Sequence, residues 1–265
     1  MRFVGVDLAW GVVNETGVVA LDQDGSIAAA GWTLGVEATA RWIEEHALSD
    51  TVAFIDAPLL VLNDTGQRIC EKQAGQRYGR WKVSANSTNK RSPRRAGVDL
   101  RERLEQAGWR YDDGTSGPPT SGRVFSECYP YTTLVGATEL GYDQERPRYK
   151  RKPRGTSVAE WRPNRAAACD ELIERLDILA SATPSMQLRT NHVTERLLDE
   201  SSPLDDRAYK HREDLIDACL AAWTAALWTV HGQARCQVLG SDDPLDDSRG
   251  ARATIIAPAR DDQRR

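Results

Sequence analysis

Alternating apolar and polar positions predict three short strands at the start of the chain. Residues 2–9 (RFVGVDLA) alternate in this way, and two more strands follow in residues 12–34, where NETG and DQDG provide turn residues. The spacing then becomes helical in GVEATARWIEEHALSD, before the short apolar run TVAFIDAPLLV predicts a buried strand. Three antiparallel strands, a helix and a strand parallel to the first predict an α/β fold: a mixed sheet with helices on both faces.

The remainder of the chain predicts mostly helices. Segments TGQRICEKQAGQRYG and AGVDLRERLEQAGW have helical spacing, RVFSECYP predicts a strand that ends at a proline, and residues 131–141 predict a short helix. Further helices are expected at about 162–182, 188–200 and 206–231, and a last short strand at ATIIAP. No repeat or convincing linker divides the sequence. We therefore expect a single domain over residues 1–265, with insertions at about 63–122 and 145–200.

Composition is that of an ordinary globular protein and argues against a membrane protein or a disulfide-rich scaffold. Of the 265 residues, 40% are hydrophobic and 28% charged, and no apolar run is long enough to span a bilayer. The strand pattern begins at residue 2, so we expect no signal peptide, no membrane partner and a cytoplasmic location. The five cysteines are dispersed without a CxxC pair, which favours reduced thiols over a zinc site or a disulfide scaffold.

Carboxylates recur where predicted strands end. Asp7 lies near the end of the first strand, Asp56 follows the apolar run VAFI, and Glu127 ends VFSE before a proline. Asp214 and Asp217 are three residues apart, on one face of a helix that is otherwise apolar. Each acid alone has a structural explanation: a turn for Asp56, a favourable helix start for Asp214, or pairing with one of many arginines for Glu127. Asp7 and Asp217 are the hardest to explain in this way, because each is placed within an apolar element.

Several acids at one end of a sheet require positive charge, and a hard divalent cation bound through oxygen supplies it. Mg²⁺ or Mn²⁺ suits such a site, whereas zinc prefers histidine or cysteine. Two ions about 4 Å apart could activate water and stabilise the leaving oxygen of a phosphodiester. Small residues on the late helix, Ala218, Ala221 and Ala222, would let it approach the sheet closely. The expected metal ligands are Asp7, Asp56, Asp214 and Asp217.

Five motifs in sequence resemble those of the domain of unknown function 429 family, predicted nucleases of the ribonuclease H-like fold. They are GVDLAW, IDAPLLVLNDTGQRICE, ECYPYTTL, YKRKPRG and HREDLIDACLAAWTA, and the resemblance extends from residue 3 to about 231. DLIDACLAA is also similar to the closing helix of Holliday-junction resolvases. The resemblance implies a ribonuclease H-like sheet, a divalent-metal site and hydrolysis of nucleic acid.

Site residues can be assigned from this resemblance by position. Asp7 would bridge metals from the first strand, Asp56 would be the fourth-strand ligand, and Asp217 the helical ligand with Asp214 beside it. Glu127 falls within the ECYP motif, and Lys150 within a tyrosine–lysine motif expected to contact phosphate. The first predicted helix departs from the ribonuclease H pattern, since its Glu44 and Glu45 offer no clear match to the usual glutamate.

Charge distribution supports a nucleic-acid partner, although the net charge is −4. Two basic stretches, residues 77–97 and 146–155, suggest a polarised surface, with solvated arginine-rich loops as the alternative. Phosphate contacts would give affinity without sequence choice. Trp81 either stacks on a base or packs within the insertion. The expected phosphate contacts are Arg77, Arg80, Lys82, Lys90, Arg91, Arg94, Arg95 and Lys150.

The leading hypothesis is a metal-dependent nuclease with all five acids catalytic, a homodimer if it acts as a resolvase. A second is a nucleic-acid-binding or accessory module that keeps the fold without catalysis. A third is an ATP-dependent phosphotransferase of the actin-like or sugar-kinase type, for which DLAWGVVNETG is a modest phosphate-loop candidate. The sequence leaves open DNA or RNA, and single-stranded, duplex or branched substrates.

Overall fold

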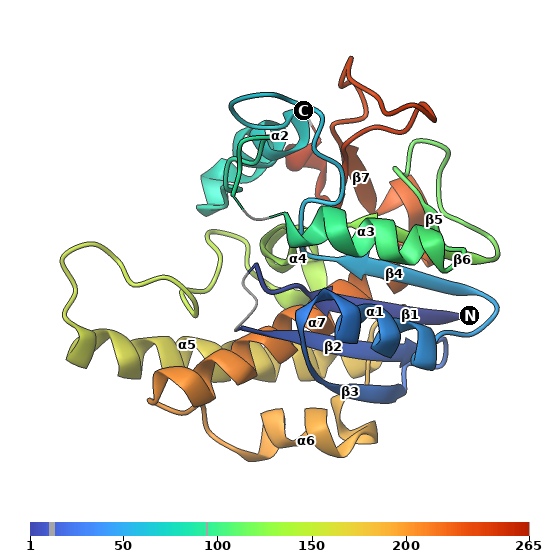
Figure 1. Ribbon diagram of the computed structural model, residues 1–265. Coiled ribbons are helices and arrows are strands. Elements are labelled where there is room, and N and C mark those ends of the chain that lie inside the picture. The colour runs from blue at the N-terminus through green and yellow to red at the C-terminus, as the bar shows by residue number, and fades with distance from the viewer. Residues whose placement is uncertain (11–13, 94, 265) are drawn as a thin grey trace.

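A mixed six-stranded sheet forms the centre of the molecule. The computed structural model describes residues 1–10, 14–93 and 95–264. Strands β1 (Arg2–Asp7), β2 (Glu15–Asp22) and β3 (Ile27–Leu34) are antiparallel neighbours, and β4 (Thr51–Ile55) pairs in parallel with β1. The strand order is β3-β2-β1-β4-β6-β5 (Figure 1). This confirms the predicted fold class and the order of its first four strands.

Two further parallel strands complete this sheet. Strand β6 (Arg123–Glu127) pairs with β4, and the two-residue β5 (Arg110–Tyr111) pairs with β6 at the edge. The strand β6 was predicted, whereas β5 is too short for an alternating pattern to reveal it. Because β1, β4 and β6 are parallel neighbours, their carboxyl ends meet at one edge of the sheet.

Helices cover both faces, as predicted. On one face, α1 (Gly35–His46) and α3 (Ala96–Gln106) pack over Val4, Val6 and Leu8 through Ile43, Leu100 and Leu104. The other face is crossed by α7 (Asp206–His231), the longest helix and almost entirely buried (Figure 1). The remaining helices are α2 (Ile69–Tyr78), α4 (Pro130–Gly136), α5 (Val158–Asp177) and α6 (His192–Asp199). Among the described residues, no helix is long and apolar enough to cross a membrane.

Glycines on the sheet allow α7 to approach unusually closely. A side chain at Gly5 of β1 would overlap the main chain of α7 at Ala218 and Ala222. Gly17 of β2 lies in the same way against the main chain of Asp214. The expectation that alanines on this helix permit a close approach is therefore correct, and the sheet contributes glycines to the same contact.

Helix boundaries differ from those expected where capping residues decide them. The helix expected at 162–182 begins at Val158, because the Ser157 hydroxyl accepts a hydrogen bond from the Glu160 amide at 3.2 Å. The segment expected as one helix at 188–200 divides into a 3-10 turn and α6, since Asn191 caps the Val193 amide. At the C-terminus, β8 (Ile255–Pro258) pairs with β7 (Cys236–Leu239), a strand not predicted, in a separate hairpin.

Candidate metal centre

Three carboxylates leave adjacent parallel strands at the same edge of the sheet. Asp7 is the last residue of β1, Asp56 follows Ile55 at the end of β4, and Glu127 ends β6. The register aligns Val6 with Ile55 and Ile55 with Glu127. The Asp56 amide donates to the Val6 carbonyl at 2.8 Å, which extends the pairing by one residue. Strand order and register therefore bring together acids that are 49 and 71 residues apart in sequence.

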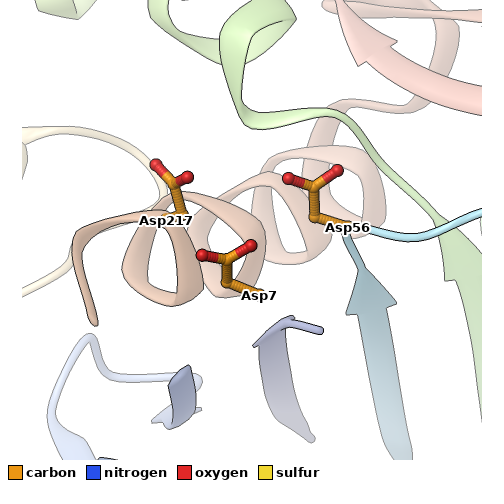
Figure 2. A group of neighbouring side chains, drawn as sticks. All are labelled: Asp7, Asp56 and Asp217. Atoms are coloured by element: carbon orange, nitrogen blue, oxygen red, sulfur yellow. The ribbon is translucent and has the colours of Figure 1, made fainter. Parts of the chain in front are cut away.

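Helix α7 adds two buried acids from the face of the sheet. Asp217 is fully buried and Asp214 is 3% exposed. Carboxylate oxygens of Asp7, Asp56 and Asp217 all lie within 4.8 Å of one another, and Figure 2 shows the three groups turned toward a common point. In the part of the chain that the structure describes, no other group of three or more aspartate, glutamate, histidine or cysteine side chains converges so closely.

Two lysines and a tyrosine contact the acids of α7. The Lys150 ammonium forms an ion pair with Oδ2 of Asp217, while the Tyr149 hydroxyl donates to Oδ1 at 2.6 Å. Lys210 lies one turn before Asp214 and pairs with its Oδ1 at 2.5 Å. Asp217 is thus held in one orientation by Tyr149, and both helical acids have a cation beside them.

Negative charge nevertheless exceeds positive charge around Asp7. Burial, followed by the charge of Asp7, raises the pKa of Asp56 to about 8, although Lys150 acts in the opposite direction. Burial and Asp7 also raise the pKa of Asp214 to about 8, against the effect of Lys210. Both carboxyls thus keep a proton near neutral pH, because burial and the nearby charge of Asp7 disfavour their ionised forms. A divalent cation would relieve this repulsion.

The donor set fits a hard divalent cation. Asp7, Asp56 and Asp217 offer only carboxylate oxygens, which Mg²⁺ and Mn²⁺ prefer. Cys128 shares the pocket of Asp7 and Asp56, but burial raises the pKa of its thiol well above the usual value, so it stays protonated. Asp214 lies outside the convergent group of three and beside Lys210, a position suited to orienting the site from its margin.

Glu127 makes a different set of contacts from those of the other four acids. Both of its oxygens accept hydrogen bonds from the Arg68 guanidinium, at 2.6 and 2.7 Å, and Oε2 also accepts from the Leu59 amide at 3.0 Å. Arg68 is bonded in turn to Glu71, which accepts from the Thr88 amide at 3.0 Å. Glu127 therefore anchors the wall of the site through this buried network, which we call the Arg68 network (Arg68, Glu71 and Glu127).

Sequence reasoning missed Arg68, and the reason is its distance along the chain. It is one of many arginines and lies 59 residues from Glu127, within a segment expected to be an ordinary helix. The signal that could have pointed to it is a buried acid at a strand end, which requires a cation. Only the fold, which brings the start of α2 to the end of β6, identifies which arginine serves.

A cavity of about 290 Å³ opens above the acids. Its floor includes Asp7, Asp56, Asp214 and Glu127. The walls come from the turn after β1, the loop after β4, the segment around Thr88, the tyrosines after β6 and the loop before α5. Among the residues of these walls are Trp10, Pro58, Thr88, Tyr131, Lys150 and Arg151.

Among the predicted phosphate contacts, Lys150 and Arg95 lie closest to this cavity. Lys150 lines it directly, and Arg95 lines a shallow extension that shares Trp10 and Pro58 with it. Arg77 instead donates to Gln237 at 2.6 Å, and Arg80 pairs with Asp262 at 3.3 Å. The basic segment therefore does not form one continuous surface facing the acids.

The remaining predicted contacts lie on surrounding loops. Lys90 pairs with Asp64 at 2.9 Å, Arg91 is exposed, and the carbonyl of Lys82 accepts from Arg146 at 2.9 Å. Arg94 lies outside the described residues, as do residues 11–13 of the candidate phosphate loop. Trp81 is buried and its indole donates to the Asp143 carbonyl, so its interpretation as a stacking residue is wrong.

Glu44 of α1 does not complete the site. Its carboxylate accepts from the Trp109 indole and pairs with Arg123 at 3.2 Å, on the face of the sheet opposite α7. The centre is therefore built from strand ends and α7, which is the arrangement expected from the resolvase-like pattern.

Comparison with known proteins identifies the family. Residues 5–243 match the family described as protein of unknown function (DUF429). The chain belongs to this family. The matched region of this DUF429 protein contains all five acids and ends before β8. Neither the curated proteins nor the solved structures compared with the chain gave a match.

Proposed function

We propose that this DUF429 protein is a divalent-metal-dependent hydrolase of phosphodiester bonds in nucleic acid. The observation that carries the proposal is the convergence of Asp7, Asp56 and Asp217 within 4.8 Å at the end of a mixed sheet. The raised pKa values of Asp56 and Asp214 support it, since burial and the charge of Asp7 disfavour their ionised forms, which Mg²⁺ or Mn²⁺ would stabilise.

The residues of the site would have three roles: binding the cation, orienting its ligands and attracting the phosphate. Asp7, Asp56 and Asp217 would hold the cation, with Asp214 at the margin where a second one would be shared. A bound cation would activate water and neutralise charge on the phosphate. Tyr149 fixes the orientation of Asp217 through its 2.6 Å hydrogen bond. Lys150 and Arg151 line the cavity, where their charges favour a phosphodiester over a neutral ligand.

The first experiment is calorimetric titration of Mn²⁺ into protein freed of divalent cations. Wild type is compared with Asp217→Asn and with a control, Asp262→Asn, which changes an exposed acid paired with Arg80. We expect binding to wild type and control and none to Asp217→Asn. Cleavage of linear, duplex and branched DNA and RNA in Mn²⁺ should then depend on Asp217. Binding or cleavage that survives in Asp217→Asn would contradict the site assignment.

A second candidate function is a nucleic-acid-binding module without catalysis. It is favoured by the cations Lys150 and Lys210, which already neutralise Asp217 and Asp214. In that case Mn²⁺ would not bind, and oligonucleotides would bind equally with and without it. The third alternative, an ATP-dependent phosphotransferase, is tested by titrating ATP into the same protein, where binding of ATP would support it.

The proposal includes a cytoplasmic location. All five cysteines are free and buried, which fits the reducing conditions of that compartment. Localisation of a tagged chain by fractionation tests this expectation.

A further inference from the structure

Trp10 is the exposed aromatic side chain of this protein. Its side chain is 42% exposed, whereas every other tryptophan, tyrosine and phenylalanine among the described residues is buried or partly buried. No hydrogen bond is formed by its indole with the residues described. Part of its apolar surface is left in contact with water. The place where this occurs is next to the acids.

The position of Trp10 is set by the same strand that carries Asp7. Trp10 follows Asp7 by three residues, and the Ala9 amide donates to the buried Thr16 hydroxyl at 3.1 Å. The side chain lines the cavity above the acids together with Pro58 and Thr88. An aromatic face is therefore presented at the wall of the cavity that contains the carboxylates.

Cations lie beside this aromatic face. Arg95 lines the shallow extension that Trp10 shares with the cavity, and it is exposed and without an ion pair among the described residues. Lys150 and Arg151 line the cavity itself. An exposed aromatic ring in a cavity lined by cations is the combination by which proteins bind single-stranded nucleic acid, with bases on rings and the backbone along positive charge.

The size of the cavity decides between single and double strands. Its volume of about 290 Å³ is at the lower limit of small-molecule pockets, about 300 Å³. That is room for about one nucleotide. Asp7 and Asp56 lie on its floor, so a phosphate must enter the cavity to approach them. A base that is paired within a duplex cannot enter such a pocket without leaving its partner.

We propose that Trp10 stacks on an unpaired base of a single-stranded nucleic acid whose neighbouring phosphate lies above Asp7, Asp56 and Asp217. This inference rests on the proposed function and specifies its substrate class. Arg95 contacts the next phosphate on the Trp10 side, and Lys150 and Arg151 contact the backbone within the cavity.

The test uses a single-stranded 12-mer with one 2-aminopurine, and the same strand annealed to its complement. Binding is measured by anisotropy at fixed salt in Ca²⁺, and stacking by quenching of 2-aminopurine. Wild type should bind the single strand more tightly than the duplex and quench the probe. Trp10→Ala should weaken binding about 5- to 150-fold and abolish quenching, since stacking on one aromatic contributes about 1–3 kcal/mol per base. Trp10→Phe should restore most of both.

The matched control is Trp42→Ala, which removes a partly buried tryptophan of α1 that stacks on His46 and does not line the cavity. It should bind as wild type does. Equal affinity for duplex and single strand, no binding by wild type, or unchanged quenching in Trp10→Ala would each overturn the inference. Cleavage is measured separately. If cleavage depends on Asp217 but Trp10→Ala has no effect on binding, the proposed hydrolase function stands and the stacking role of Trp10 is wrong. If binding depends on Trp10 but no cleavage occurs, only the hydrolase function is contradicted.

Discussion

Gly17 on β2 lies directly against the main chain of Asp214 on α7, so that any side chain at position 17 would overlap the Asp214 carbonyl group. Gly5 on β1 makes the equivalent contact with Ala218 and Ala222. No side chain separates helix from sheet at these two points. This closeness is what allows an acid on the helix to meet acids at the strand ends.

Replacing Gly17 by alanine should therefore displace α7 and disturb the centre. Overpacking of this kind costs about 1–3 kcal/mol, and we expect that loss in urea unfolding together with weaker Mn²⁺ binding. The control is Gly31→Ala on β3, where an added methyl group would meet nothing within 4 Å. Similar losses in both variants would show that the contact with α7 is not the cause.

Removal of Arg68 should be among the most destabilising changes in the protein. Arg68→Met leaves Glu71 and Glu127 buried without a cation, which costs about 3–5 kcal/mol. The exposed pair of Arg80 and Asp262 provides the comparison, because Arg80→Met should change stability by less than about 1 kcal/mol. Chemical unfolding of the two variants measures the difference, and an equal effect would argue against a structural role for the Arg68 network.

Stability without divalent cations should fall as pH rises from 5.5 to 8.5. The folded-state pKa of Asp56, about 8, lies above its ordinary value of 3.8, so the folded state binds a proton that the unfolded chain has released. Its contribution to stability is complete below the unfolded pKa and is lost as pH rises through about 8. Asp214 adds to the same trend.

Thermal unfolding in EDTA at several pH values measures this trend, with each kcal/mol corresponding to about 2–4 °C in Tm for a domain of this size. Asp56→Asn should flatten the dependence. Added Mn²⁺ should reverse its sign, because a cation competes with protons for the same carboxylates. A Tm that rises with pH in EDTA would mean that these acids are ionised without a cation.

Lys150 should compete with the cation for Asp217. Its ammonium contacts Oδ2 of that residue, so a bound Mn²⁺ must share the carboxylate with it or displace it. We expect Lys150→Met to tighten Mn²⁺ binding about tenfold, since a nearby unit charge contributes about 1–4 kcal/mol. The same variant should bind oligonucleotides more weakly. Lys72→Met, on an exposed position of α2, serves as the control in both titrations.

Much of the centre could be predicted from the sequence because its geometry follows from local patterns. Alternation locates the ends of β1, β4 and β6, and parallel neighbours must share an edge, so Asp7, Asp56 and Glu127 had to lie close together. The three-residue spacing of Asp214 and Asp217 places both on one helix face. Those patterns were sufficient for five of the six strands of the sheet, for α7 and for the meeting of Asp7, Asp56 and Asp217.

Contacts between distant loops could not be predicted in this way. The arginines of residues 77–97 differ little in sequence, yet Arg77 contacts Gln237 and Arg80 contacts Asp262, residues more than 150 positions away. Trp81 and Trp10 are equally plausible aromatics in sequence, and only packing buries one and exposes the other. Of the hairpin of β7 and β8, only β8 was predicted, although the two strands are equally long.

The Arg68 network has a consequence for how the cavity wall opens to solvent. The amides of Leu59 and Thr88 belong to no helix or strand, yet each is bonded to a buried carboxylate, at 3.0 Å in both cases. Their protons can exchange with deuterium only when the network breaks, so both should exchange late and together, at a rate close to that of the central strands. Two loops without regular secondary structure would then open only together with the sheet, and faster opening of the cavity would be left to its other walls, among them the loop that carries Lys150.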